Sequence, residues 1–189
     1  MANSKVEQYI DSLIKREGGY VNNRHDRGGA TRWGITEAVA RKFGYQGAME
    51  SLPPSLAREI YLKEYWTGCG FAAVELRSRA IAEELFDTGV NMGQGTATMF
   101  LQRALNIFNQ SHREVPLYPE IKVDGDLGGK TLAALDAFLK LRGQEGETVL
   151  LRALNCLQGA RLFDITEKRE ANEEFTYGWF AHRIAVAGD

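Results

Sequence analysis

One stretch of the chain, residues 20–35, interrupts an otherwise helical pattern. Glycine, asparagine and aspartate punctuate it, and threonine, tryptophan, valine and isoleucine stand between these turn-forming residues. Before it, Ser4 and Glu7 have the spacing of a capping box, and apolar residues recur at helical intervals, which predicts a helix from about residue 5 to Glu17. The interruption therefore predicts a small β-hairpin that directly follows a helix.

Helical spacing resumes after the hairpin and continues through most of the chain. Helices are predicted from the N-cap Thr36 to about residue 43, from Pro54 to about residue 65, and over 78–88, 96–109, about 130–141 and about 147–163. Residues 110–122 contain two prolines and lose periodicity, which is typical of a linker. We therefore expect a mostly α fold of the α+β kind: a helical bundle with one small hairpin in residues 1–109, and a smaller helical module in residues 110–189, packed against the first.

Composition and charge exclude several classes of function. The 189 residues carry a net charge of −2, with 13 basic and 12 acidic residues up to Asn109 and 10 basic and 13 acidic residues after it. Neither part has the clustered positive charge that nucleic-acid binding needs. There is no continuous apolar segment of the length of a secretory signal or a membrane span. Cys69 and Cys156 have no partner at zinc-ligand spacing, so we expect buried thiols and no metal. No nucleotide cofactor is expected either, because the chain has no glycine-rich phosphate-binding motif.

Glu17 is the first candidate for chemistry. Its spacing from Leu13 and Ile14 places it on the apolar face of the first helix, in the last turn. Desolvation and the negative end of the helix dipole would both raise the pKa of its carboxyl, as a general acid requires. The alternative is a solvated glutamate at a helix end. Asp26 and Thr31 follow in the predicted hairpin, where a second carboxylate and a hydroxyl could face Glu17.

These residues also carry a family resemblance. The segments EGGYVNN and DRGGATRWGIT resemble the pattern of glycoside hydrolase family 108, the N-acetylmuramidase family of phage endolysins and toxin-secretion muramidases. VDGDLGGKT, residues 123–131, resembles the core of the peptidoglycan-binding module that usually follows this catalytic domain. The resemblance continues at Tyr65-Trp66, at Asp87, Val90, Asn91 and Gly93, and at Gly178, Trp179 and Arg183.

The resemblance implies a lysozyme-like fold and a set of site residues. By position, Glu17 matches the catalytic acid of the family, and Asp26 and Thr31 match the acidic residue and the threonine that follow it. Two positions depart from the pattern: Arg27 stands where proline is common, and Trp33 where tyrosine is common. An arginine beside Asp26 favours its ionised form.

The expected reaction is cleavage of the β-1,4 bond between N-acetylmuramic acid and N-acetylglucosamine, which lyses the bacterial wall. Glu17 would protonate the glycosidic oxygen, and Asp26 with Thr31 would hold water; whether the product is inverted or retained stays open. Two alternatives remain: a lytic transglycosylase, which uses one glutamate and no water, and a non-catalytic peptidoglycan-binding or secretion accessory protein.

Several further residues are candidates for substrate binding, each with a structural alternative. Aromatic rings can stack on sugars or belong to the core, and an asparagine at a helix end can bind an acetamido group or form a turn. The residues Asp124-Gly125-Asp126 begin like a calcium loop, but later ligand positions are missing, so metal binding is not expected. The substrate-binding candidates are Tyr20, Trp33, Tyr65, Trp66, Asn91, Asp124 and Trp179.

The resemblance also implies a partner and a place of action. Peptidoglycan is the expected partner, and nucleic acid and stable membrane insertion are not expected. We expect a monomer that is made in the bacterial cytoplasm without a signal peptide and acts on the periplasmic cell wall. Export would then need a separate route, such as a holin-type pore.

Overall fold

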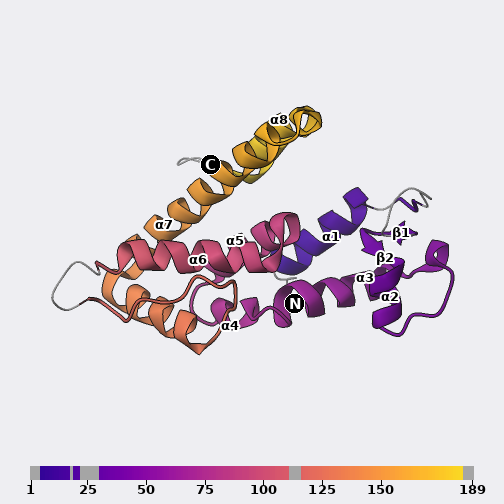
Figure 1. The fold of residues 1–189 in the computed structure, drawn as a ribbon. Helices are drawn as coiled ribbons and strands as arrows, with labels where there is room; N and C mark the ends of the chain where they lie inside the picture. Colours follow the sequence, from indigo (N-terminus) through magenta and orange to yellow (C-terminus); the bar gives the residue numbers. More distant parts are fainter. Residues whose placement is uncertain (1–4, 18, 22–29, 111–115, 185–189) are drawn as a thin grey trace. The chain divides into compact units, whose positions relative to one another are not determined.

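The computed structural model describes residues 5–17, 19–21, 30–110 and 116–184 (Figure 1). The fold is mostly helical with a small two-stranded antiparallel sheet and a helical C-terminal part, which confirms the predicted fold class. The chain divides into two compact units, Met1–Cys69 and Gly70–Asp189. The boundary that we predicted after Asn109 falls within the second unit, just after a helix ends at Phe108.

The first unit is built around helix α1 (Lys5–Glu17), as predicted. The side chains of Val6, Ile10 and Leu13 are buried on one face of α1, and this helix packs against α3 (Pro54–Tyr61), which buries Ala57, Ile60 and Tyr61. An ion pair between Asp11 and Arg58 links the two helices beside this apolar contact. The apolar periodicity of α1 therefore serves to hold it on α3.

The predicted hairpin is present and is short. Strands β1 (Thr31–Arg32) and β2 (Ile35–Thr36) pair antiparallel, with Arg32 opposite Ile35. The two residues between them, Trp33 and Gly34, have φ of 56° and 74°, and positive φ at both positions is the feature of the tight type I′ turn. The hairpin leads directly into α2 (Glu37–Lys42), where Thr36 caps the helix by accepting a hydrogen bond from the backbone of Val39 at 3.4 Å.

The end of the first unit departs from regular helix. After the 3-10 turn η1 (Met49–Ser51), the helix predicted from Pro54 to about residue 65 begins as α3 but continues as a π-helix, η2 (Leu62–Thr67). Gly68 ends it by donating a backbone hydrogen bond to the Lys63 carbonyl at 2.7 Å. A side chain at Gly68 would place its Cβ 2.6 Å from that carbonyl oxygen, so glycine is required there.

The second unit is a bundle of helices (Figure 1). The helices α5 and α6 pack side by side, α4 packs on α5, and α7 contacts both α5 and α6. Their contacts bury a shared core that includes Phe71, Leu85, Phe86, Leu101 and Leu135. The bounds are α4 (Phe71–Glu75), α5 (Arg79–Met92), α6 (Gln94–Phe108), α7 (Gly129–Glu167), η3 (Glu170–Asn172) and α8 (Glu173–Arg183).

Helix α7 contains the break that its glycines predict. Gly143 has φ 57° and ψ −149°, which lie outside the helical region, so α7 consists of two helical segments joined at a kink. Its second segment ends at Glu167, four residues beyond the predicted end. At the C-terminus, η3 and α8 pack on α7, where the rings of Phe163 and Phe180 meet at 5.1 Å between centroids.

Two expectations from the sequence are wrong. Asn91 does not follow a helix end, because α5 continues to Met92. Cys156 is exposed and Cys69 is half-buried, so the thiols are not both buried. The neighbours of Cys156 on α7, Leu154 and Gln158, face the core, and Cys156 lies on the outer side of the helix. Within the part of the chain that the structure describes, no helix combines the length and the hydropathy of a membrane span.

Candidate active site

The backbone ties the end of α1 to the hairpin. Glu17 is the last residue of α1, and Val21, four residues later, pairs with Thr31 through two backbone hydrogen bonds of 2.9 and 2.8 Å. The bridge therefore brings the chain just after Glu17 to the start of β1. Asp26 and the side chain of Glu17 lie outside what the structure describes, so the structure does not test the predicted pairing of the two carboxyls.

Three contacts hold Trp33 at the tip of the hairpin. Its indole Nε1 donates to the Leu52 carbonyl at 2.7 Å, and its own carbonyl accepts from the Tyr61 hydroxyl at 3.0 Å. The guanidinium of Arg32 lies 4.9 Å from the centre of the ring. A positive φ is uncommon for a large side chain and costs free energy, so these contacts fix a strained turn. The ring is half-buried, and part of its surface faces solvent.

The aromatic residues predicted to bind sugar differ in how much of their surface is exposed to solvent. Tyr20 is 38% exposed, whereas Trp66 is only 8% exposed and lies among core residues of the first unit. Tyr65 is half-buried and its ring lies 5.6 Å from that of Tyr61. Burial, followed by the negative charge of Glu64, raises the pKa of Tyr65. Trp66 therefore has the least surface to offer a ligand.

In the second unit the structure brings two predicted substrate-binding residues together. Asn91 and Trp179 both line a cavity of about 350 Å³. Asn91 lies in the last turn of α5, where its amide donates to the Asp87 carbonyl at 2.7 Å. The other lining residues are Met92, Leu162, Ile165, Arg169 and Asn172. The cavity thus combines an indole, two amides and one cation, which are groups that bind polar ligands such as sugars.

Asp124 belongs to a loop that a buried glutamine organises. The side chain of Gln102 donates to the Asp124 carboxylate at 2.9 Å and to the Asp126 carbonyl at 3.0 Å, and accepts from the backbone of Asp124 and Gly125 at 3.0 Å each. The hydrogen bond from Gln102 is the main cause that lowers the pKa of Asp124. Gly125 has φ 78°, and a Cβ there would lie 2.9 Å from the Gly95 carbonyl. One oxygen of Asp124 is thus committed to the loop.

Sequence reasoning missed a polar cluster between α5 and α7. Glu84 and Asp87 on α5 face Asn155 and Gln158 on α7, and Gln158 donates to the Asp87 carboxylate at 3.0 Å. Burial, then the charge of Asp87, raises the pKa of Glu84 to about 7, against a hydrogen bond with Asn155 that lowers it. One carboxyl oxygen of Glu84 is buried and accepts no hydrogen bond from the described residues. Glu84 lies three residues after the buried Ile81 on α5, and this helical spacing is the signal that places it beside the core.

Two parts of the chain match known family models. Residues 10–93 match the model of glycosyl hydrolase 108, and residues 96–184 match that of a predicted peptidoglycan domain. Residues 10–93 therefore form a glycosyl hydrolase 108 domain. The resemblance carried by the EGGY and GGATRWGIT segments is thereby confirmed. The chain joins this glycosidase domain to a peptidoglycan domain, and the combination supports a peptidoglycan hydrolase.

A solved structure has a similar fold over most of the chain. The structure of Brucella abortus SagA is similar to it with a TM-score of 0.63 and 22% sequence identity, over 95% of this chain and 90% of the SagA chain. At this sequence identity the similarity shows a shared fold. No curated protein matches the chain.

Among the residues described here, no three histidine, cysteine or acidic side chains gather as a metal site would require.

Proposed function

We propose that this glycosyl hydrolase is an N-acetylmuramidase, which cleaves the β-1,4 bond between N-acetylmuramic acid and N-acetylglucosamine in peptidoglycan. The observation that carries the proposal is the match of residues 10–93 to the glycosidase family, together with a peptidoglycan domain in the rest of the chain. The position of Glu17 at the end of α1, followed by the Val21–Thr31 bridge, agrees with a site formed by a helix end and a hairpin.

In the proposed mechanism Glu17 acts as the general acid. Its carboxyl proton passes to the glycosidic oxygen while the bond from that oxygen to the anomeric carbon of N-acetylmuramic acid breaks, and positive charge develops on the sugar ring. Asp26 stabilises this charge or accepts a proton from water, and the hydroxyl of Thr31 positions that water. The oxygen of the water ends on the anomeric carbon, which leaves a reducing end on N-acetylmuramic acid.

The proposal also covers binding and the place of action. Tyr20, Trp33 and Tyr65 of the first unit offer ring surface for stacking on sugars, and the cavity of Asn91 and Trp179 offers amides for acetamido groups. A peptidoglycan substrate places the site of action at the bacterial wall, where cleavage weakens the wall and lyses the cell. We propose that a holin-type pore provides the route to the periplasm.

The test is digestion of purified Gram-negative peptidoglycan, followed by mass spectrometry of the soluble fragments. The native protein is compared with Glu17→Gln, which removes the acid and keeps the shape of the side chain, and with the matched control Glu50→Gln in η1 of the same unit. We expect reducing N-acetylmuramic acid ends from the native protein and the control, and a loss of at least a hundredfold in Glu17→Gln.

The other outcomes identify the alternatives. Anhydro-sugar ends from the native protein would identify a lytic transglycosylase. Binding to the wall without release of any fragment would identify a non-catalytic binding protein. Undiminished digestion by Glu17→Gln would show that a different residue is the acid.

A further inference from the structure

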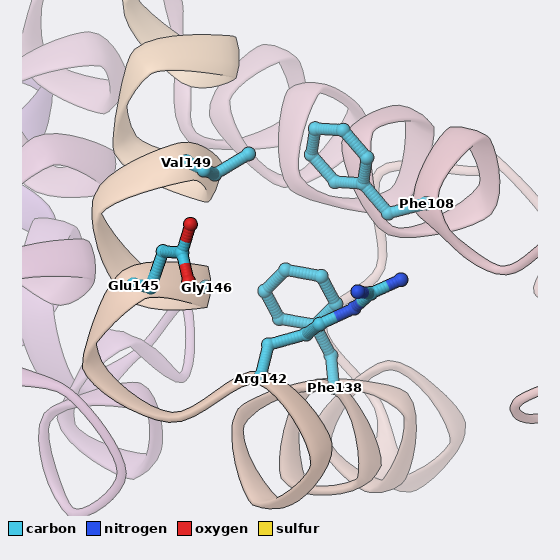
Figure 2. Close-up of a pocket in the computed structure, with 6 residues that line it drawn as sticks. All are labelled: Phe108, Phe138, Arg142, Glu145, Gly146 and Val149. Atoms are coloured by element: carbon cyan, nitrogen blue, oxygen red, sulfur yellow. The ribbon is translucent and has the colours of Figure 1, made fainter.

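A second cavity, in the peptidoglycan domain, is not used by the proposed reaction. It has a volume of about 270 Å³ and is lined by six residues of α6 and α7: Phe108, Phe138, Arg142, Glu145, Gly146 and Val149 (Figure 2). The rings of Phe108 and Phe138 stack with 5.7 Å between their centroids and 25° between their planes. Phe138 is 2% exposed and forms the apolar floor of the cavity.

The kink in α7 shapes this cavity. Arg142 precedes the non-helical residue Gly143, and Glu145, Gly146 and Val149 follow it, so the cavity lies where the two segments of α7 meet. Gly146 is buried so closely that a Cβ there would lie 2.1 Å from the Cβ of Arg142 and 3.4 Å from the ring of Phe138. The break and the glycine together let the backbone of α7 pass close to Arg142 and to the ring that forms the floor of the cavity.

Two opposite charges stand at the rim of the cavity. Arg142 and Glu145 are both exposed, and among the described residues neither forms an ion pair or a hydrogen bond. In Figure 2 the guanidinium of Arg142 and the carboxylate of Glu145 lie on opposite sides of the Phe138 ring. Burial raises the pKa of Tyr118 to about 12, and the positive charge of Arg142 opposes that rise.

We propose that this cavity binds the stem peptide of peptidoglycan. The guanidinium of Arg142 would pair with a peptide carboxylate, Glu145 with an ammonium group, and the rings of Phe108 and Phe138 with the aliphatic chain between them. In Gram-negative walls the stem peptide has this combination, because it holds free carboxylates and a diamino acid on a short aliphatic chain. Glycan strands carry neither a cationic group nor such a chain. The inference rests on the proposed function, since an enzyme that acts on the wall is what meets these peptides.

The test measures binding of free stem peptides to the full-length protein by isothermal titration calorimetry. The probe is the peptide fraction that an amidase releases from Gram-negative peptidoglycan, and glycan strands stripped of peptide serve as the comparison. We expect the native protein to bind the peptides. Arg142→Ala should weaken binding about tenfold to a hundredfold, as expected for loss of a charge-assisted hydrogen bond, and Glu145→Gln should weaken it about tenfold.

Two further variants separate the cavity from the general charge of the helix. Val149→Trp fills the rim without changing charge and should also weaken binding at least tenfold. Arg152→Ala removes an exposed arginine of the same helix outside the cavity, and should leave binding unchanged. Thermal melts of all variants establish that they are folded.

The outcomes distinguish this inference from the proposed function. Equal peptide affinity in the native protein and in Arg142→Ala and Val149→Trp would overturn the cavity as the site, even where wall digestion is intact. Failure of the native protein to bind stem peptides would overturn it as well. Peptide binding that depends on Arg142 and Val149, in a protein that does not digest the wall, would support this inference while the proposed function fails.

Discussion

Glu84 gives a prediction about how stability depends on pH. In the folded protein, burial and the charge of Asp87 raise the pKa of the Glu84 carboxyl to about 7 from its ordinary value of 4.5. The folded state therefore favours the protonated carboxyl. As pH rises above 4.5 the unfolded chain ionises first, the folded state is progressively penalised, and the penalty is complete above pH 7.

The difference between the two pKa values sets the size of this penalty. A difference of about 2.5, at 1.36 kcal/mol for each pKa unit, costs about 3 kcal/mol of the free energy of unfolding at pH 8 and almost nothing at pH 4.5. Glu84→Gln replaces the carboxyl with a neutral group that keeps an oxygen for Asn155. We therefore expect this variant to be more stable than the native protein by about 3 kcal/mol at pH 8, with little difference at pH 4.5.

Urea unfolding followed by circular dichroism at several pH values between 4.5 and 8 measures this difference. Glu120→Gln, which removes an exposed carboxyl from the same unit, is the matched control and should show little dependence on pH. A difference between Glu84→Gln and the native protein that stays constant across this pH range would refute the reasoning. It would mean that Glu84 is ionised in the folded protein as it is in the unfolded chain.

Two more predictions concern single side chains that organise loops. Gln102→Ala removes the buried side chain that bonds Asp124, Gly125 and Asp126, and should cost about 2–4 kcal/mol because it removes four hydrogen bonds and leaves part-buried groups of the loop without a partner. Urea unfolding measures the cost, and a loss below about 1 kcal/mol would argue against this role. Trp33→Phe keeps an aromatic side chain but removes the indole N–H that donates to the Leu52 carbonyl, and should cost about 1–2 kcal/mol. An unchanged unfolding midpoint in Trp33→Phe would mean that the other two contacts suffice to hold the turn.

Much of the fold follows from local patterns. The helix Lys5–Glu17, the hairpin, the cap at Thr36 and the break at Gly143 each depend on residues close together in the sequence, and each was predicted. The π-helix after Tyr61 was not, because it depends on how Gly68 closes against the Lys63 carbonyl. A pattern of apolar residues does not distinguish that closure from an ordinary helix end.

In the candidate site, too, local sequence patterns predict some features, and others depend on tertiary packing. The family resemblance predicts Glu17, Asp26 and Thr31 as site residues, and the backbone bridge accounts for how the chain after Glu17 reaches Thr31. The roles of Gln102 and Glu84 could not be predicted, because tertiary packing brings Gln102 to the loop at residues 124–126 and Glu84 to Asn155 on α7. A polar residue within an apolar helix stripe, such as Gln102 next to Leu101, is the one sequence signal that could have identified such a site.

The Val21–Thr31 bridge affects how many residues the chain can hold between these two partners. Because the two hydrogen bonds of the bridge fix where the chain leaves and re-enters the hairpin, residues added or removed between them leave the register of β1 and β2 and the core beneath unchanged. Closing a longer loop is entropically inexpensive, since doubling its length costs only about 0.6 kcal/mol. We therefore expect that a change in the number of residues between Val21 and Thr31 alters the free energy of unfolding by less than about 1 kcal/mol, while β1 and β2 keep their pairing.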